Sequence, residues 1–305
     1  MAAAALLACD WGTTHLRAWT LDARGALVAT RTFELGVGRL APGEAAQRFV
    51  DEVRPALDAQ GLPAMLCGMI GSNLGWTVAP YVDGPAGLAE VAAALVRIPE
   101  ADVRIAPGLR CRTTWDTVDV MRGEETQILG WIARRPARAH GARLVCHPGT
   151  HTKWALVQDG RITRFQTAMT GELFAVLRGH SVLRGPEAAD DPAAFDAGLA
   201  AAGDGQALAA RLFSARSRVV GDGRPAEETA SYLSGLLIGA DVAATPALLD
   251  AGDLPVALLG DPALCGWYGR ALTARGVEHT IDDGEAAALA GLHALWKLEA
   301  SHAPG

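Results

Sequence analysis

The feature that most constrains this chain is Asp10-Trp11-Gly12-Thr13-Thr14, a short loop between two strand-like runs. The run before it, Ala4–Cys9, is apolar and predicts a buried strand, and residues 15–21 predict a second strand. A glycine followed by two threonines lets backbone N–H groups and hydroxyls approach an anion closely. Asp10 offers the oxygen ligands that suit a magnesium ion. Taken alone, such a loop is typical of an ordinary hairpin.

A second copy of the loop, in the other half of the chain, strengthens the first. Residues 143–147 predict a buried strand, Gly149-Thr150 follows, and residues 152–157 predict the returning strand. When the copies are laid over each other, Cys9 falls on Cys146 and Gly12 on Gly149. Short Gly-Thr hairpins also recur by chance. The more specific interpretation is a duplicated domain whose two anion-binding loops face each other across a cleft.

The composition fits a compact globular enzyme. The chain has 305 residues, 50% hydrophobic and 20% charged, so it can bury a core large enough to divide into two domains. Its net charge of −7 disfavours nucleic acid or an anionic membrane surface as a partner. The five cysteines are odd in number and lack metal-site spacing, which predicts reduced thiols in the cytoplasm. No apolar run is expected to reach transmembrane length.

Two further segments suggest ligand contacts. Residues 68–76 form a glycine-rich loop in which Ser72, Asn73 and Trp76 stand between the glycines. Such a loop suits hydrogen bonds to hydroxyls and stacking on a sugar-like ring, although an ordinary glycine-rich connection has the same composition. Residues 256–265 predict a strand, a glycine turn and a helix with an early proline, an arrangement that can seat a nucleotide.

Residues 118–132 predict a single helix that carries Glu124 and Glu125. Negative charge in a first helical turn complements the helix dipole, so the two acids also have a purely structural interpretation. Adjacent helical residues point about 100° apart, so we expect only one of the two to face a cleft. Residues 134–141 predict the link between the halves, and residues 284–298 predict a final helix that packs back across the core.

Three of these elements, in this order, resemble the sugar kinase, actin and Hsp70 superfamily, in which they form the phosphate-1, phosphate-2 and adenosine segments. Four longer motifs resemble the 2-dehydro-3-deoxygalactonokinase family over nearly the whole chain: DWGTTHLRAW, GMIGSNLGW with APYV, MRGEETQ, and PGTHTKW with MTGELF. The resemblance implies an α/β fold of two actin-like (ribonuclease H-like) domains, residues 1–138 and 139–305, flanking a cleft for nucleotide and substrate.

The resemblance also implies an ATP-dependent kinase that phosphorylates 2-dehydro-3-deoxy-D-galactonate to its 6-phosphate with the help of Mg²⁺. Asp10 is expected to hold the metal ion. The residues expected to bind ATP lie in the three segments: Gly12, Thr13, Thr14, Gly149, Thr150, Thr152, Gly260, Asp261 and Ala263. Thr152 stands where the family pattern has serine, a change that keeps the hydroxyl.

The catalytic residues implied by the resemblance are Asp10 and Glu124. MRGEETQ resembles the helix start that carries the general base in related carbohydrate kinases, and Glu124 takes that position. The residues expected to bind the sugar acid are Arg17, Gly71, Ser72, Asn73, Trp76, Arg122 and Lys153. Arg122 is favoured as the residue that binds the carboxylate, because a planar guanidinium suits a carboxylate and because Arg122 adjoins Glu124 in the sequence. The other candidates are Arg17, Arg39 and Lys153.

Other interpretations stay open. The chain could phosphorylate a different sugar or sugar acid on the same fold, or be a nucleotide-binding regulator that has lost catalysis. An actin-like filament former is less favoured, because the short chain lacks evident inserts for polymer contacts. The expected partner is a small sugar acid, and a homodimer is compatible with the sequence. The sequence leaves open the stereochemistry of the acid, the phosphorylated hydroxyl, the oligomeric state and the role of residues 190–210.

Overall fold

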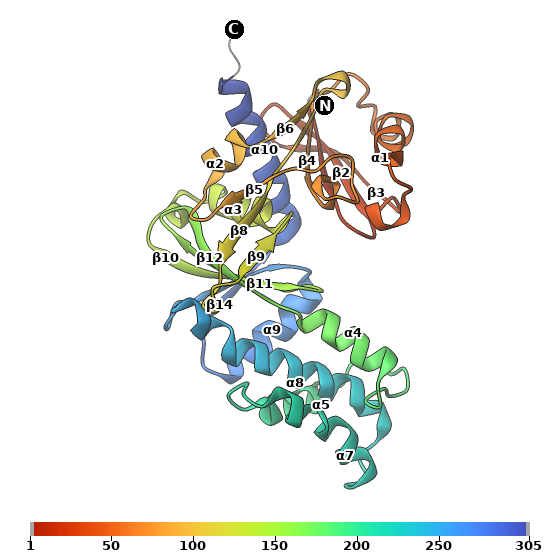
Figure 1. Ribbon diagram of the computed structural model, residues 1–305, viewed down its shortest axis with the longest axis vertical. Helices are drawn as coiled ribbons and strands as arrows, with labels where there is room; N and C mark the ends of the chain where they lie inside the picture. The colour runs from red at the N-terminus through yellow and green to blue at the C-terminus, as the bar shows by residue number, and fades with distance from the viewer. Residues whose placement is uncertain (1–2, 303–305) are drawn as a thin grey trace.

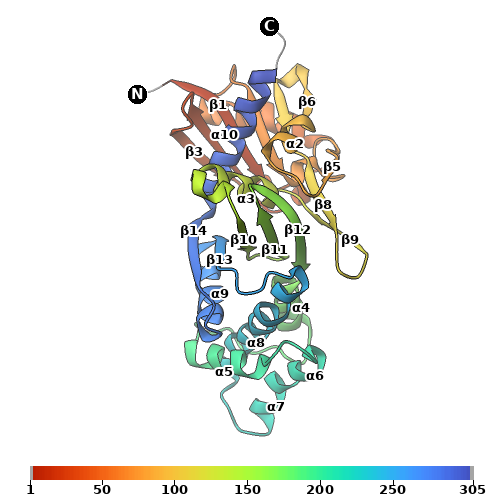
Figure 2. The same ribbon diagram turned by 90° about the vertical axis from the view of Figure 1, so that its left-hand side faces the viewer.

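The computed structural model describes residues 3–302, so the outermost residues of the two predicted domains lie outside the description. A six-stranded sheet forms one end of the molecule, a five-stranded sheet the middle, and a layer of helices the other end (Figures 1 and 2). The six-stranded sheet has the order β3-β2-β1-β4-β7-β6. Its strands are β1 (Ala4–Trp11), β2 (Leu16–Asp22), β3 (Leu27–Phe33), β4 (Ala64–Gly68), β6 (Val96–Ile98) and β7 (Val103–Ile105).

The five-stranded sheet repeats the topology of the first. Its order is β12-β11-β10-β13-β14, with β10 (Ala142–His147), β11 (Thr152–Gln158), β12 (Arg161–Ala168), β13 (Val256–Gly260) and β14 (His279–Asp283). In each sheet the first strand of the hairpin runs antiparallel to its successor and parallel to the strand on its other side. This repetition confirms the predicted α/β fold with a duplicated, actin-like unit.

Two helices cross between the sheets. A Cβ on Gly130 of α3 (Glu124–Ala133) would stand 2.0 Å from the Ala287 carbonyl oxygen of α10 (Gly284–His302). A Cβ on Gly291 would likewise stand 2.1 Å from the Thr126 carbonyl oxygen. One apolar core, with residues from both sheets, surrounds this crossing. The final helix thus packs back onto the first sheet, while the predicted boundary at residues 138 and 139 stays a prediction.

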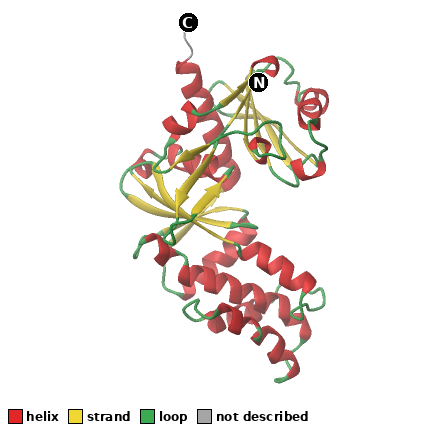
Figure 3. Cartoon of the chain, viewed as in Figure 1, coloured by secondary structure: helices red, strands yellow, loops and turns green. Residues whose placement is uncertain are grey.

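Within residues 3–302, the helical layer contains five helices that follow β12 and one that follows β13 (Figure 3). The first five are α4 (Thr170–His180), α5 (Pro192–Ala202), α6 (Leu208–Leu212), α7 (Ser214–Val220) and α8 (Thr229–Ala244), and the last is α9 (Pro262–Ala274). The segment Ala226–Leu249 is long and apolar enough to cross a membrane, which contradicts the expectation that no run reaches that length. However, 67% of its apolar stretch of 18 residues is buried inside the protein, because α8 packs against α4, α5 and α9. Its apolar character therefore serves the core of this layer.

The prediction of one helix over residues 118–132 is wrong for its first part. Residues Val118–Met121 form β9, which pairs with β8 (Gly108–Arg112), and β8 pairs with β5 (Tyr81–Asp83) in a third, smaller sheet. Gly123 has φ +106°, a conformation that glycine adopts readily and that separates β9 from α3. Two smaller helices complete the fold, α1 (Glu44–Arg48) and α2 (Leu88–Ala93), the latter packed on α10.

Candidate active site

The loop between β1 and β2 is fixed by a second, glycine-containing turn. The backbone N–H groups of residues 36–38 donate to the carbonyl oxygens of residues 12–14 at 3.0 to 3.2 Å. A Cβ on Gly36 would stand 2.1 Å from the carbonyl carbon of Thr14, so this close approach requires glycine. The loop held in this way lines the adjoining cavity with residues 12–14.

That cavity, of 550 Å³, brings the two predicted anion-binding loops together. Its lining residues come from both halves of the chain: Asp10, Gly12, Thr13, Thr14, His15, Arg17, Thr32 and Thr150. The first loop and Thr150 of the second therefore face each other across one space, in the arrangement that the duplication predicts.

A row of side chains links Asp10 to the second half of the chain. Arg17, the cross-strand neighbour of Asp10, donates to Oδ2 at 2.5 Å, and Nε2 of Gln127 lies 3.4 Å from the same oxygen. The other amide atom of Gln127, Oε1, is 2.8 Å from Nε2 of His147 at the end of β10. Since Gln127 turns its nitrogen to a carboxylate, its oxygen accepts, and Nε2 of His147 carries the proton.

Burial lowers the pKa of His147, against the opposite effects of the nearby carboxylates of Glu124 and Asp10. The imidazole is therefore neutral at pH 7. It lines a second cavity, of 720 Å³, together with Gln127 and Arg17. Arg17 lines both cavities, so the two are neighbouring parts of one cleft.

The late strand–glycine–helix forms the far wall of this second cavity. Gly260 and Asp261 line it, and the Asp261 carboxylate accepts from the N–H of Leu264 at 2.9 Å, which caps α9. Ala263 lies exposed in the first turn of α9, outside the lining of this cavity. The structure thus brings two of the three predicted adenosine-segment residues to the cleft.

Glu124 and Glu125 have opposite surroundings at the start of α3. Glu125 is fully buried and accepts from the N–H of Gly123 at 2.6 Å and from the Thr126 hydroxyl at 2.8 Å. Burial, reinforced by the charge of Glu124, raises the pKa of Glu125 to about 8. Glu124 is partly exposed and accepts from the N–H of Arg122 at 3.0 Å. Of the two acids, Glu124 is the accessible one, and it acts electrostatically on His147.

Arg122 lies against the glycine-rich loop and β5. Its Nη2 donates to the Ala79 carbonyl at 2.8 Å, and its guanidinium stacks 4.4 Å above the ring centre of Tyr81. A Cβ on Gly71 would stand 2.9 Å from Nη1, so glycine at residue 71 gives the guanidinium room in this position. Within residues 3–302, Nε and Nη1 are buried without a hydrogen-bond acceptor. The predicted motifs around residues 71, 79 and 122 therefore meet at one cation with unpaired donors.

Other residues predicted to bind the acid have contacts within the protein. Trp76 packs on Phe49 with ring centres 5.5 Å apart, and the Ser72 hydroxyl donates to the Met69 carbonyl at 2.7 Å. Asn73 is exposed on the same loop. Lys153 is buried, and its Nζ donates to the Val120 carbonyl and the Thr167 hydroxyl at 3.0 and 2.9 Å. Lys153 thereby ties β11 to β9 and is not free to pair with a ligand in this conformation.

Thr152 is also separated from the loops. Its side chain is fully buried, and its hydroxyl is 2.8 Å from the hydroxyl of Tyr268 on α9. Tyr268 in turn donates to the Oδ2 of Asp241 at 2.7 Å. The buried Asp241 carboxylate also accepts from Trp154 on β11, Thr170 on α4 and Thr245 after α8. This cluster joins the second hairpin to three helices of the helical layer.

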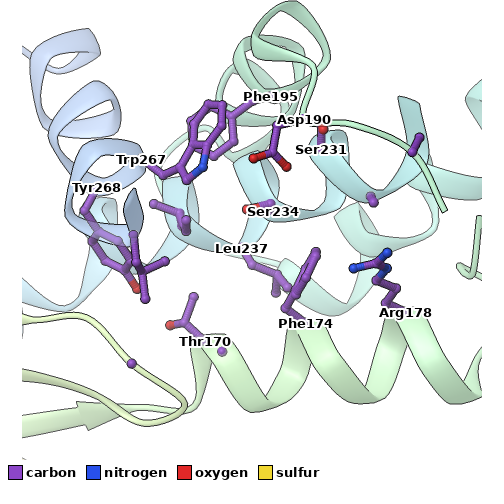
Figure 4. A pocket seen from close by; sticks show the side chains of 16 residues that line it. Thr170, Phe174, Arg178, Asp190, Phe195, Ser231, Ser234, Leu237, Trp267 and Tyr268 are labelled. Atoms are coloured by element: carbon purple, nitrogen blue, oxygen red, sulfur yellow. The ribbon is translucent and has the colours of Figure 1, made fainter. Parts of the chain in front are cut away.

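A third cavity, of 240 Å³, lies between α4, α8 and α9 (Figure 4). Apolar and aromatic side chains form most of its wall, among them Phe174, Leu237 and Trp267, and polar groups lie around them. Gly149 of the second loop also lines it. The cavity therefore extends from the second loop into the helical layer.

Sequence reasoning missed Gln127, His147 and most residues of the third cavity. Gln127 belongs to the MRGEETQ motif, and His147 occupies the position that the duplication matches with Asp10. Both residues could therefore have been recognised in the sequence. Of the residues that line the third cavity, Gly149 was predicted to bind ATP, and Thr170, Gly171 and Phe174 belong to the MTGELF motif. No local pattern marked the lining residues on α8.

The residues around Asp10 fit a magnesium ion. Mg²⁺ keeps several waters and takes one or two carboxylates together with phosphate oxygens, so a single Asp beside two loops predicted to bind phosphate is sufficient. Asp10 lines the cavity with a carboxylate, and Thr13 and Thr14 line it beside Asp10 with hydroxyl-bearing side chains. Among residues 3–302 no group of three or more His, Cys, Asp or Glu side chains could hold a metal ion by protein ligands alone.

The repeated sheet, the paired loops and the cleft between them define an actin-like kinase fold. Component A of (R)-2-hydroxyglutaryl-CoA dehydratase from Acidaminococcus fermentans shares it with a TM-score of 0.52 at 13% identity, over 96% of this chain and 98% of that one. A crystal structure described as a 2-dehydro-3-deoxygalactonokinase protein from Sinorhizobium meliloti matches far better, with a TM-score of 0.84 at 37% identity, over 96% of this chain and 98% of that one.

Sequence comparisons give the same relatives. The 2-dehydro-3-deoxygalactonokinase of Escherichia coli (strain K12) is 36% identical over 95% of this chain and 96% of its own. A probable 2-dehydro-3-deoxygalactonokinase of Rhizobium meliloti (strain 1021) is 38% identical over 95% of this chain and 97% of its own. The model of the 2-keto-3-deoxy-galactonokinase family matches residues 10–295. The chain belongs to this family.

Proposed function

We propose that this chain transfers the γ-phosphoryl group of ATP to 2-dehydro-3-deoxy-D-galactonate, giving the 6-phosphate and ADP. The observation that carries the proposal is the segment from Arg122 to Gln127. It presents a cation with unpaired donors, an accessible carboxylate and an amide bonded to Asp10. This stretch of six residues thus provides Arg122 as a cation for the acid and Glu124 as a base for its hydroxyl. Gln127 links the same stretch to Asp10 beside the loop of residues 12–14. Membership of the kinase family supports the choice of substrate.

Arg122 binds the carboxylate of the acid in this proposal. Its Nε and Nη1 lack acceptors, while Nη2 and the stacked Tyr81 ring hold the guanidinium in place. A charge-assisted hydrogen bond to a carboxylate is stronger than one between neutral groups, and a fixed guanidinium loses little freedom on binding.

Glu124 is the general base. The hydroxyl oxygen of the acid forms a bond to the γ-phosphorus while the bond from that phosphorus to the bridging oxygen of ADP breaks, and the hydroxyl proton moves to Glu124. Such transfers depend mainly on positioning and charge stabilisation. Residues 12–14 and 149–150 hold the phosphate oxygens from the two sides. Asp10 holds Mg²⁺, which when bound offsets the negative charge of the transferring group.

The nucleoside of ATP occupies the third cavity, beside Leu264 and Trp267 of α9, and not the second cavity that the predicted residues Gly260 and Asp261 line. Gly149 connects this cavity to the phosphate-2 loop, and aromatic side chains such as Phe174 and Trp267 provide an apolar wall for a base. The cavity has a volume of 240 Å³, which is enough for the nucleoside part of ATP but not for the whole molecule, as expected if the phosphates extend into the cleft.

Three carboxylate variants test the assignment. Glu124→Gln keeps the size of the side chain but removes the acceptor charge, so kcat should fall roughly 10²–10⁴-fold while ATP binding survives. Glu125→Gln should be much milder, because Glu125 is buried within α3. Asp10→Asn should raise the Mg²⁺ concentration needed for half-maximal rate.

ADP release is measured with a panel of keto-deoxy sugar acids. Near-normal kcat in Glu124→Gln together with an inactive Glu125→Gln would assign the base to Glu125. If another acid gives a higher kcat/KM than 2-dehydro-3-deoxy-D-galactonate, that acid is the preferred substrate. The absence of ADP release with every acid would contradict a kinase of this class.

A further inference from the structure

The third cavity has a phosphate end and a far end, and contacts on α4 tell them apart. Gly171 approaches the second loop so closely that a Cβ would stand 2.4 Å from the Gly149 carbonyl oxygen. The N-terminal end of α4 therefore marks the phosphate end. Arg178 also lines the cavity, and a rise of 1.5 Å per residue places it about 10 Å farther along the helix.

The helix α8 forms the opposite wall, and it too has one end at the phosphate end of the cavity and the other at the far end. Its Asp241 accepts from Thr170 at the phosphate end, at 2.8 Å. Ser231 lies at the other end of α8, about 15 Å from Asp241 along the axis. Figure 4 shows Ser231 beside Asp190 and away from Thr170. The far end of the cavity thus carries Asp190, Ser231 and Arg178.

Asp190 is held at this end by its neighbour in the sequence. The N–H of Asp191 donates to the Ser231 hydroxyl at 2.9 Å, and the Asp191 carboxylate caps α5 by accepting from Ala193 and Ala194. Among residues 3–302, no cation and no N–H group pairs with the Asp190 carboxylate. An anion with unfilled acceptor positions therefore lines the end of the cavity that lies farthest from the phosphates.

We propose that Asp190 accepts a hydrogen bond from the exocyclic amino group of adenine and thereby selects the base of the nucleotide. The inference rests on the proposed function, because phosphates at Gly149 place the ribose in the middle of the cavity and the base at its far end. A carboxylate only accepts hydrogen bonds, so it complements an amino group and repels a carbonyl oxygen at the same position. The first residues of the 190–210 region then belong to the nucleotide site.

The test compares ATP with purine riboside triphosphate, which lacks only the amino group. Binding is measured by calorimetry and turnover by product release, in the wild type, Asp190→Ala and Asp190→Asn. A hydrogen bond to a charged group corresponds to a preference for ATP of about tenfold or more. Asp190→Ala should abolish this preference, and Asp190→Asn, which keeps one acceptor oxygen, should retain part of it. Glu187→Ala, on the same loop but outside the cavity lining, should keep it in full.

Each other outcome has a definite meaning. An unchanged preference for ATP in Asp190→Ala overturns the inference but leaves the kinase assignment intact. 2′-Deoxy-ATP is measured as a third nucleotide. If Asp190→Ala loses the preference for ATP over 2′-deoxy-ATP but keeps the preference for ATP over purine riboside triphosphate, Asp190 contacts the ribose and the inference is overturned. Failure of the wild type to bind either nucleotide overturns the proposed function itself. Asp190 is exposed, so thermal melting of the variants should match the wild type.

Discussion

Arg122 is the residue on which recognition of the acid depends in our proposal. We expect Arg122→Ala to raise KM for the sugar acid strongly, since losing a partly buried partner of a carboxylate costs about 2–5 kcal/mol. KM for ATP should change little, because the guanidinium contacts residues 71, 79 and 81 and neither phosphate loop. Steady-state kinetics with each substrate varied in turn measures both values.

Arg122→Lys is the matched control for this prediction. It keeps the charge but loses the planar donors, so it should recover only part of the affinity for the acid. If instead KM for ATP rises in Arg122→Ala and KM for the acid stays constant, Arg122 contacts the phosphates. The carboxylate would then be bound by Arg17 or Arg39.

Glu125 should make the stability of the protein depend on pH. Its pKa is about 8 in the folded protein against an ordinary value of 4.5, so folding favours its protonated form. The resulting contribution to stability is fully present below about pH 4.5 and is lost as the pH rises through about 8. Glu125→Gln removes this titration, so the wild type should lose Tm relative to the variant as the pH rises across that window. Parallel Tm curves for the two proteins would show that Glu125 is charged in the folded state.

At the level of residues, the sequence predicted what short motifs contain and missed what tertiary contacts create. Asp10, Thr13 and Thr150 lie in one cavity because their hairpins duplicate each other. The direction of the Thr152 side chain could not be predicted in the same way. Alternate residues of a strand point to opposite faces, and Thr152, the first residue of β11, faces the core. The link from His147 to Asp10 likewise depends on how the halves approach each other.

Among the elements, the crossing of α3 and α10 depends on glycine. Gly130→Ala places a methyl group against the Ala287 carbonyl, so the helices must separate, and overpacking of this kind costs about 1–3 kcal/mol or more. This outweighs the gain in helix propensity of about 1 kcal/mol. Chemical denaturation should therefore show a lower free energy of unfolding for Gly130→Ala.

Gly266→Ala on α9 provides the control for this prediction. A Cβ on Gly266 meets nothing within 4 Å, so only the helix propensity acts and the variant should be more stable than the wild type. Equal effects of the two substitutions would mean that α3 and α10 adjust to the methyl group easily.

The positions of elements were predictable where apolar runs and turn residues coincide, as for β1 and β10, although β1 continues to Trp11, two residues beyond the predicted end of the strand. The strand β9 was missed because residues 118–132 were interpreted as one helix with an acidic first turn, although the polar run Arg122–Gln127 interrupts the apolar pattern after Met121. In the structure the positive φ of Gly123 lies between the strand and the helix. A glycine alone in a sequence does not show whether its φ angle is positive, so this boundary required the structure.

At the scale of the whole molecule, we expect the two sheets to close on each other when both substrates bind. The loop of residues 12–14 belongs to one sheet and Thr150 to the other, and a cavity of 550 Å³ separates them. Neither loop alone can enclose a γ-phosphate, so binding energy is gained only if the cavity narrows. Small-angle scattering with Mg²⁺, a non-hydrolysable ATP analogue and the sugar acid should show a smaller radius of gyration than the free protein. Each ligand alone should give a smaller change, and an unchanged radius with all ligands at saturation would mean that the cleft is already closed enough for transfer.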